Sequence, residues 1–438
     1  MPYSLAVAQR EASTISICER RELFHLLRPR FRDAILKAMN KDFLKLWSAQ
    51  IGSAFGSRLT RTALPVLAIL TIKASPAEIA ILGALSVAPG VLVGLFAGGP
   101  VDRGRKRPLL VWADLVRAVL ILTVPAVALL GPVSMLHLYL VAGMVGAATS
   151  LFQIADRSFL PLIVPTDRLV AANARLQATE SIAEAAGPGA AGILIQIVGA
   201  PIALAVDAVT YLWSALMLSR IKTVERPAEA EPAPAHVLSD ISAGLRAVHA
   251  DPVIGPTLIA DGVIYLAGGY YVALYMVLAL KSLGLSPAVT GLIITLGGFG
   301  AFVGSLIAPR MARLVGAGPA MVLALAIGQA GNLAIPLTLT FPKFAIPLLC
   351  VQQILADAFA TAYVIHAISL RQRLMPEAVL GRANAAFQVV VGLMLPLGAL
   401  IAAPLSETIG VGPCLWIAAG GGLLAAPVLL RSAILKLR

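Results

Sequence analysis

Long, mostly uncharged runs of apolar residues follow one another from residue 42 to the end of the chain. A helix needs about 20 apolar residues to cross a hydrocarbon core of about 30 Å. The runs are rich in Ala, Leu, Gly and Val and lack the short alternating strands of a β-barrel. We therefore expect an all-α integral membrane protein with 12 transmembrane helices, at about residues 42–72, 77–98, 108–130, 134–155, 170–198, 201–220, 253–280, 286–308, 318–340, 343–366, 380–405 and 412–431.

Composition agrees with this class, because 59% of the residues are hydrophobic and 13% are charged. A soluble domain is usually about 45–50% apolar and about 25% charged. The net charge of +12 is carried in short clusters between the apolar runs, so nucleic acid is not an expected partner. Cys18, Cys350 and Cys414 lie far apart, and the five histidines show no metal spacing. We expect no metal and no cofactor.

Basic residues between the segments give the chain an orientation. If the N-terminus is cytoplasmic, the outside loops hold only Lys73, Lys281 and Lys343. The inside loops and tail then hold Arg103, Arg105, Lys106, Arg107, Arg157, Arg168, Lys222, Arg226, Arg310, Arg313, Arg371, Arg373, Arg431, Lys436 and Arg438. Because cytoplasmic loops carry the excess of Lys and Arg, we expect a multi-pass protein of the cell inner (plasma) membrane with both termini cytoplasmic.

The chain divides into two halves of six spans. Residues 223–236, "TVERPAEAEPAPAH", are polar and rich in Pro and Ala, which is typical of a flexible linker. The sequence "VPTDRLVAANARLQ" (164–177) matches "MPEAVLGRANAAFQ" (375–388) at several positions with one constant offset. Two repeated halves with a site between them are typical of transporters. The expected parts are a cytoplasmic N-terminal extension (1–41), an N-terminal half (42–221), a linker with a short surface helix (222–252) and a C-terminal half (253–438).

The N-terminal extension allows three interpretations. Residues 22–39 are basic and amphipathic, so they are able to lie on the anionic inner leaflet. The alternatives are a disordered extension, or translation that begins at Met39. No apolar signal-peptide core precedes them.

A compact group of charges lies in "GGPVDRGRKRPLL", residues 98–110, in the loop between the second and third spans. It resembles the loop 2–3 signature of the major facilitator superfamily, with Gly98, Asp102, Arg103, Lys106 and Arg107 at its positions. Lys106 replaces a more usual Arg, and Arg105 stands where the superfamily commonly has Gly. The resemblance implies a latch at one gate. Asp102 would lie at a helix N-terminus, which favours an anion by about 0.3–1 kcal/mol, and the basic residues would bridge to Asp114. The alternative is a signal for membrane topology only.

The fifth span contains "GPGAAG", Gly187 to Gly192. It resembles the antiporter motif of the superfamily, with Ala191 in place of one glycine. Pro188 removes a helix hydrogen bond and allows a kink, and the small residues Gly187 and Gly192 permit close packing of helices. "SFLPLIVPTDRLVAANA" and "LAVDAVTYLWSALML" are similar to the branch of enterobactin exporters and macrolide efflux proteins.

Charged residues inside the spans are expensive in a bilayer and therefore indicate function. They include Arg58 and Arg61 in the first span, Glu180 and Glu184 in the fifth, Asp207 in the sixth, Asp261 in the seventh and Asp357 in the tenth. The resemblance implies that Arg58, Asp261 and Asp357 face the cavity. Arg58 and Glu184 lie at similar depth, so we expect Arg58 to pair with Glu184 or Glu180. The pair is either a proton and substrate site or a static staple between two helices, whereas Asp207 is expected to be structural.

Together these patterns predict a major facilitator fold in which two six-helix halves are related by a pseudo-two-fold axis. The predicted function is a proton-coupled secondary active transporter that exports small drug-like or siderophore-like molecules by alternating access, as a monomer in the lipid bilayer. A passive facilitator or a lysolipid flippase is the alternative. A membrane-embedded enzyme is less favoured, because no P-loop, HExxH or nucleophile elbow is present. The sequence leaves open the substrate, the coupling ion and the direction of transport.

Overall fold

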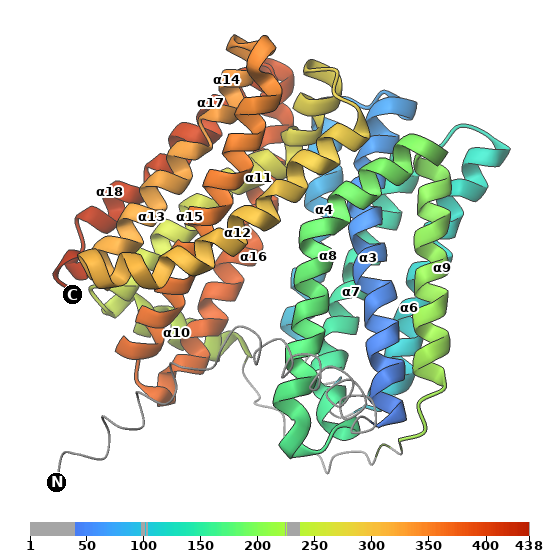
Figure 1. The fold of residues 1–438 in the computed structure, drawn as a ribbon, viewed down its shortest axis with the longest axis horizontal. Helices are drawn as coiled ribbons and strands as arrows, with labels where there is room; N and C mark the ends of the chain where they lie inside the picture. The colour runs from blue at the N-terminus through green and yellow to red at the C-terminus, as the bar shows by residue number, and fades with distance from the viewer. Residues whose placement is uncertain (1–39, 98–100, 102–103, 224, 226–236, 438) are drawn as a thin grey trace, which may run out of the picture.

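The computed structural model describes residues 40–97, 101, 104–223, 225 and 237–437, and all regular elements in these residues are helices (Figure 1). The extension before residue 40 and the loop residues Gly98, Asp102 and Arg103 lie outside the described residues.

The first half consists of six membrane-length segments. They are α3 (Lys41–Leu67) with its continuation η1 (Ala68–Ile72), α4 (Pro76–Phe96), α6 (Lys106–Leu130), α7 (Met135–Ile163), α8 (Leu169–Val198) and α9 (Ala200–Ser219). The short η2 (Thr166–Arg168) precedes α8.

The second half repeats this order after the surface helix α10 (Val237–Ala250). Its segments are α11 (Ile254–Val277) with η3 (Leu278–Ser282), α12 (Pro287–Val315), α13 (Ala317–Gly331) with α14 (Ala334–Thr340), α15 (Ala345–Leu374), α16 (Glu377–Thr408), and α17 (Val411–Leu423) with α18 (Ala425–Leu430). The short η4 (Pro342–Phe344) precedes α15, and η5 (Ala433–Lys436) ends the chain. Both η1 and η3 are π-helical turns at the end of the first span of a half.

The twelve expected segments are all helical in the structure. Eleven of them are long and apolar enough to cross a membrane. The remaining segment, α3, carries Lys41, Asp42, Lys45, Arg58 and Arg61 over its 27 residues. It packs against α8 and α9 within the bundle, and Asp42, Lys45, Arg58 and Arg61 form ion pairs.

Several helices run further than the sequence predicted. The expected ends at residues 155, 308 and 366 are wrong, because α7, α12 and α15 continue to Ile163, Val315 and Leu374. Beyond the hydrocarbon core a helix carries charged residues without penalty. The extensions of α7, α12 and α15 end shortly before Pro165, Gly316 and Pro376. The extensions of α7 and α12 each also contain one proline, Pro161 and Pro309. Basic residues assigned to loops, such as Arg157 and Arg371, therefore lie on helices.

The two halves meet at one end of the molecule and diverge at the other (Figure 1). Helix α8 packs on α12, and α4 packs on α16 and α11. At the end where they meet, Ser75 Oγ lies 3.0 Å from Glu407 Oε1. There the N–H of Ala288 also donates to Gln196 Oε1 at 3.3 Å.

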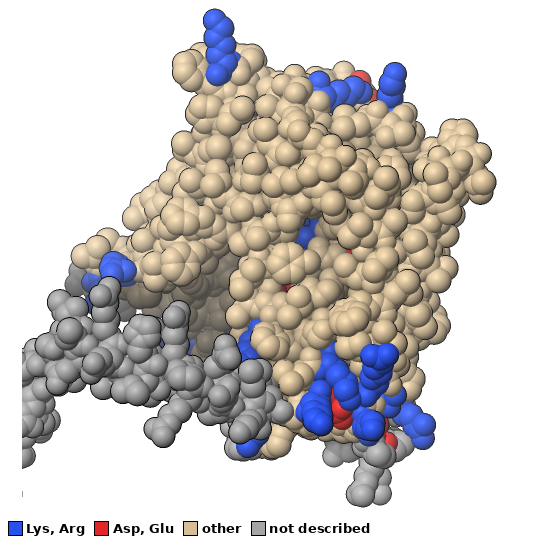
Figure 2. All heavy atoms as spheres, turned by 45° about the vertical axis from the view of Figure 1, so that its right-hand side comes forward, with Lys and Arg blue, Asp and Glu red and all other residues tan. Residues whose placement is uncertain are grey.

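Charged side chains gather at the ends of the molecule, and the face drawn in Figure 2 is mostly uncharged between them. A few Lys, Arg, Asp or Glu atoms show through this uncharged middle region (Figure 2). The face is hollowed beside the region where the halves diverge (Figure 2). An uncharged middle region between charged ends is expected for a protein surrounded by lipid.

Candidate transport site: a buried arginine between two glutamates

Arg58 of α3 lies between two carboxylates of α8. Its Nη2 atom forms ion pairs with both Glu180 and Glu184. The Arg58 side chain is 8% exposed, whereas those of Glu180 and Glu184 are 48% and 58% exposed. Arg61 Nη1 lies 3.8 Å from Glu184 Oε1, and the Arg61 side chain is 67% exposed. The pairing expected from equal depth is confirmed, and both glutamates are engaged.

Helical spacing explains why these four side chains meet. Residues three or four positions apart lie on one face of a helix, so Arg58 and Arg61 face the pair Glu180 and Glu184. A buried guanidinium costs several kcal/mol unless it is paired and hydrogen-bonded. The two glutamates supply that pairing. Because their side chains are about half exposed, other groups can reach them while they are paired with Arg58.

Gly187 of the antiporter-like motif provides the space for Arg58. A Cβ atom at Gly187 would lie 2.7 Å from Cβ and 2.8 Å from Cγ of Arg58. Carbon atoms do not approach this closely without displacement, so any larger residue here would push the arginine away from α8. The motif is therefore directly connected with the ion pair.

The other small residues of the motif form the contact between the two halves. The N–H of Gly189 donates to Thr295 Oγ1 of α12 at 3.0 Å. A Cβ atom at Gly192 would overlap the carbonyl oxygen of Pro287, and one at Gly291 would overlap that of Pro188. The sequence left a kink and close packing open, and these contacts show close packing. One short stretch of α8 thus contacts both Arg58 and the opposite half.

Asp261 and Asp357 both contact helices of their own half, and Asp357 also lies within electrostatic range of Glu184. Asp261 of α11 accepts a hydrogen bond from Tyr363 Oη of α15 at 2.6 Å. Asp357 of α15 is half-buried, and a Cβ atom at Gly297 of α12 would overlap its Oδ2 atom. The structure therefore brings together Arg58, Glu180 and Glu184 but does not place Asp261 in this cluster.

Asp114 is buried within the first half and has a partner that the sequence analysis overlooked. It forms an ion pair with Arg117, three residues later on α6. The guanidinium of Arg117 lies 4.4 Å from the ring centres of both Phe152 and Tyr211, a geometry that favours a cation. The sequence analysis expected basic residues of the loop to bridge to Asp114, and in this structure the Arg107 side chain donates to the carbonyl of Ser219. The Asp114–Arg117 spacing of three residues was the available signal.

Asp207 has the structural surroundings that the sequence predicted. It is fully buried and accepts hydrogen bonds from the hydroxyls of Thr60 and Thr210. A Cβ atom at Gly56 would overlap its Oδ1 atom, so α3 and α9 pack closely around it.

Two carboxylates that the sequence analysis did not select join the start of the linker to the first half. Asp42 accepts hydrogen bonds from Lys222 and Thr223, and Glu225 accepts from the N–H groups of Lys106 and Arg107. No local spacing indicates these contacts, because they join residues more than 100 positions apart. Among the residues that the structure describes, no cluster of His, Cys, Asp or Glu is suited to a metal ion.

Known structures share this architecture. The nucleoside transporter NupG superposes with a TM-score of 0.73 at 14% identity, over 91% of this chain and 100% of NupG. A bacterial homologue of the iron transporter ferroportin in its inward-facing state gives a TM-score of 0.69 at 17% identity, over 89% and 98% of the two chains. The same homologue's outward-facing state gives 0.53 at 18% identity, over the same shares. The fold is therefore that of these transporters.

Two helical halves, the first of which holds a buried arginine paired with two glutamates, form a membrane transporter of the major facilitator type. Residues 36–438 match the model of the transmembrane secretion effector family, and the chain belongs to that family. No curated protein matches the sequence. The resemblance to the major facilitator superfamily is confirmed, whereas the narrower enterobactin and macrolide branch stays a prediction.

Proposed function

We propose that the protein is a proton-coupled exporter of small molecules that works by alternating access. The observation that carries this proposal is the buried guanidinium of Arg58 held by two half-exposed glutamates. The glutamates lie on α8, which packs on the opposite half through Gly189 and Gly192. Loss or formation of the ion pair can thus affect the contact between the halves, because both involve α8.

The same ion pair provides a route for coupling between proton and substrate. An anionic group of a substrate can replace a glutamate as the partner of Arg58, since guanidinium binds carboxylate and phosphate groups well. The released glutamate then takes up a proton, which keeps the number of charges around Arg58 constant. Substrate binding and protonation of a glutamate would in this way be linked at one site.

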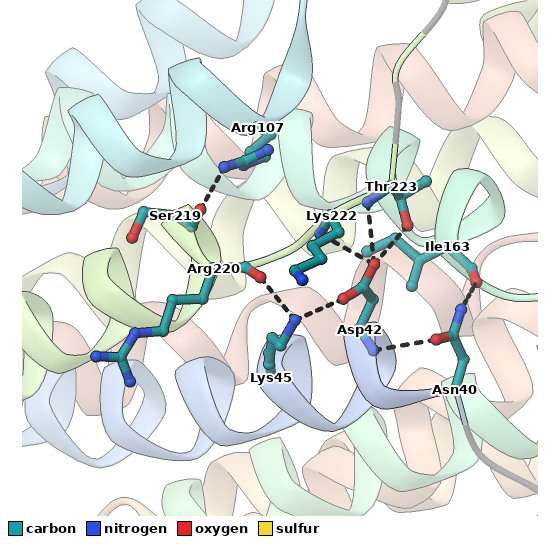
Figure 3. Close-up of polar contacts among 9 residues, drawn as sticks. All are labelled: Asn40, Asp42, Lys45, Arg107, Ile163, Ser219, Arg220, Lys222 and Thr223. Atoms are coloured by element: carbon teal, nitrogen blue, oxygen red, sulfur yellow. Dashed lines mark hydrogen bonds and ion pairs between the residues drawn. The ribbon is translucent and has the colours of Figure 1, made fainter.

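We assign the open end of the molecule to the cytoplasm, and the positions of basic residues support this assignment. The ends of α3, α6 and α9 at this end carry Lys45, Arg107 and Arg220, and the linker carries Lys222 (Figure 3). An excess of Lys and Arg is typical of the cytoplasmic side. On this assignment both termini are cytoplasmic, and the conformation is ready to receive a substrate from inside the cell.

The substrate is expected to carry an anionic or strongly polar group. We suggest a thermal-shift screen of the purified protein with siderophores, macrolides and lysolipids. The compound with the largest shift is then used in inverted vesicles, where uptake is measured with and without a proton gradient. A proton gradient is expected to increase wild-type uptake.

Glu184→Gln tests the coupling. This variant should lose proton-driven uptake but retain exchange of labelled for unlabelled substrate. Glu78→Gln is the matched control, because Glu78 belongs to a capping box at the start of α4 that glutamine preserves. Wild-type uptake that ignores the gradient would instead establish a passive facilitator, and movement of the lysolipid between leaflets would establish a flippase.

A further inference from the structure

The start of the linker between the halves is bound tightly to the first half. Asp42 Oδ2 accepts hydrogen bonds from the N–H of Lys222, the N–H of Thr223 and the Thr223 hydroxyl, at 3.0, 3.0 and 2.9 Å (Figure 3). Its Oδ1 atom lies 2.7 Å from Lys45 Nζ. Asp42 is buried, and these four donors satisfy both of its oxygens. The linker therefore begins as part of the first half.

Basic side chains satisfy the end of α9 beside this contact. Lys45 Nζ donates to the carbonyl of Arg220 at 2.6 Å, and Arg107 Nη2 donates to the carbonyl of Ser219 (Figure 3). The last carbonyls of a helix carry partial negative charge, which favours cations there. The side chain of Arg107 is in this way held within its own half.

Glu225 binds the beginning of α6. Its two carboxylate oxygens accept hydrogen bonds from the N–H groups of Lys106 and Arg107 at 2.5 and 2.7 Å. The residue at the N-cap position, Arg105, supplies no side-chain hydrogen bond of its own. The cap of α6 therefore comes from the linker, 118 or 119 residues away.

The other end of the linker belongs to the opposite half. Helix α10 packs on α16, where a Cβ atom at Gly244 would overlap the carbonyl of Arg382. Asp251, after α10, caps α11 by accepting from the N–H groups of Val253 and Ile254 at 2.8 Å. That cap is local, whereas the cap on α6 depends on where the linker lies.

We propose that Glu225 and the end of α9 form a holding site for the basic start of α6 while the halves are apart at this end. The argument rests on the proposed alternating access. Lys106 and Arg107 are the residues that the loop 2–3 signature assigns to a latch between the halves. In this structure the Arg107 side chain donates to the end of α9 in the first half. The backbone N–H groups of Lys106 and Arg107 donate to Glu225 of the linker. When the halves close at this end, the holding site releases them to the opposite half.

A contact that exists in only one conformation changes the balance between conformations. Removal of the Glu225 charge weakens the holding site but leaves the latch residues intact. The population with the halves closed at this end should therefore increase. Asp42→Asn is a second test, because it weakens the anchor of the same segment without touching α6.

The experiment measures the distance between the diverging ends of α8 and α12 by double electron–electron resonance spectroscopy. Val170 and Leu314, which are 82% and 83% exposed, are changed to cysteine and spin-labelled in a background that lacks Cys18, Cys350 and Cys414. Glu225→Gln is expected to increase the short-distance population by a factor of about ten, the effect of about 1.4 kcal/mol. Asp251→Asn, the matched capping control, should leave it unchanged. Hydrogen exchange at Lys106 and Arg107 is measured in the same samples.

The outcomes separate three cases. A wild-type protein with one fixed distance at every pH and with every screened compound would contradict alternating access itself. Two wild-type distances whose ratio does not change in Glu225→Gln or Asp42→Asn would overturn the holding site alone. Faster exchange at Lys106 and Arg107 without a change in distances would reduce Glu225 to a helix cap and also overturn it. A shift in either variant that Asp251→Asn does not reproduce supports the proposal.

Discussion

Gly187 and Arg58 face each other so closely that even one methyl group does not fit between them. This approach determines which residue the antiporter-like motif can have at its first position. It also gives the most direct test of the ion pair, because the substitution that disturbs Arg58 lies on another helix and changes no charge.

Gly187→Ala should displace the Arg58 side chain from Glu180 and Glu184. Overpacking of this kind typically costs about 1–3 kcal/mol, so we expect a lower unfolding temperature together with loss of proton-driven uptake. Gly420→Ala is the control, since nothing lies within 4 Å of a Cβ atom there. Normal coupling in a folded Gly187→Ala protein would show that the position of Arg58 is not critical.

Gly192→Ala should weaken the end where the halves meet, because its Cβ atom would overlap the Pro287 carbonyl of α12. We expect fewer molecules in the conformation described here and a larger closed population at the opposite end. The spin-label distance between positions 170 and 314 measures this directly. An unchanged distance distribution would mean that α8 and α12 adjust locally instead of separating.

Arg117→Met should be strongly destabilising, because it leaves Asp114 buried and unpaired. Breaking a buried ion pair typically costs about 3–5 kcal/mol, whereas replacing both partners is often much less harmful. The double variant Asp114→Leu/Arg117→Met should therefore lose less stability than the two single variants together. Thermal unfolding in detergent gives all three values, and simple additivity would contradict the pairing.

Asp102→Asn should slow transport about tenfold, a barrier change of about 1.4 kcal/mol, without reducing expression or membrane insertion. The expectation comes from the loop 2–3 signature, in which this carboxylate belongs to the gate. The initial rate of uptake into vesicles is the measurement, normalised to the amount of inserted protein. Full activity would leave the loop as a topology signal.

Patterns along the sequence predicted the parts of this fold that depend on the bilayer. Hydropathy located the twelve segments, and depth within the membrane predicted the partners of Arg58. The helix ends at Ile163 and Val315 were missed, since hydropathy reports where the hydrocarbon ends and not where hydrogen bonding stops. The contacts of Asp42 and Glu225 were missed for another reason. They depend on how distant loops come together, which periodicity and spacing do not describe.

The π-helical turns η1 and η3 also carry information about ancestry. Each contains five residues and ends the first span of its half. Such turns are rare in proteins, and separate acquisition at matching places is a poor explanation for two of them. Their matching places therefore support a common six-helix origin of the two halves.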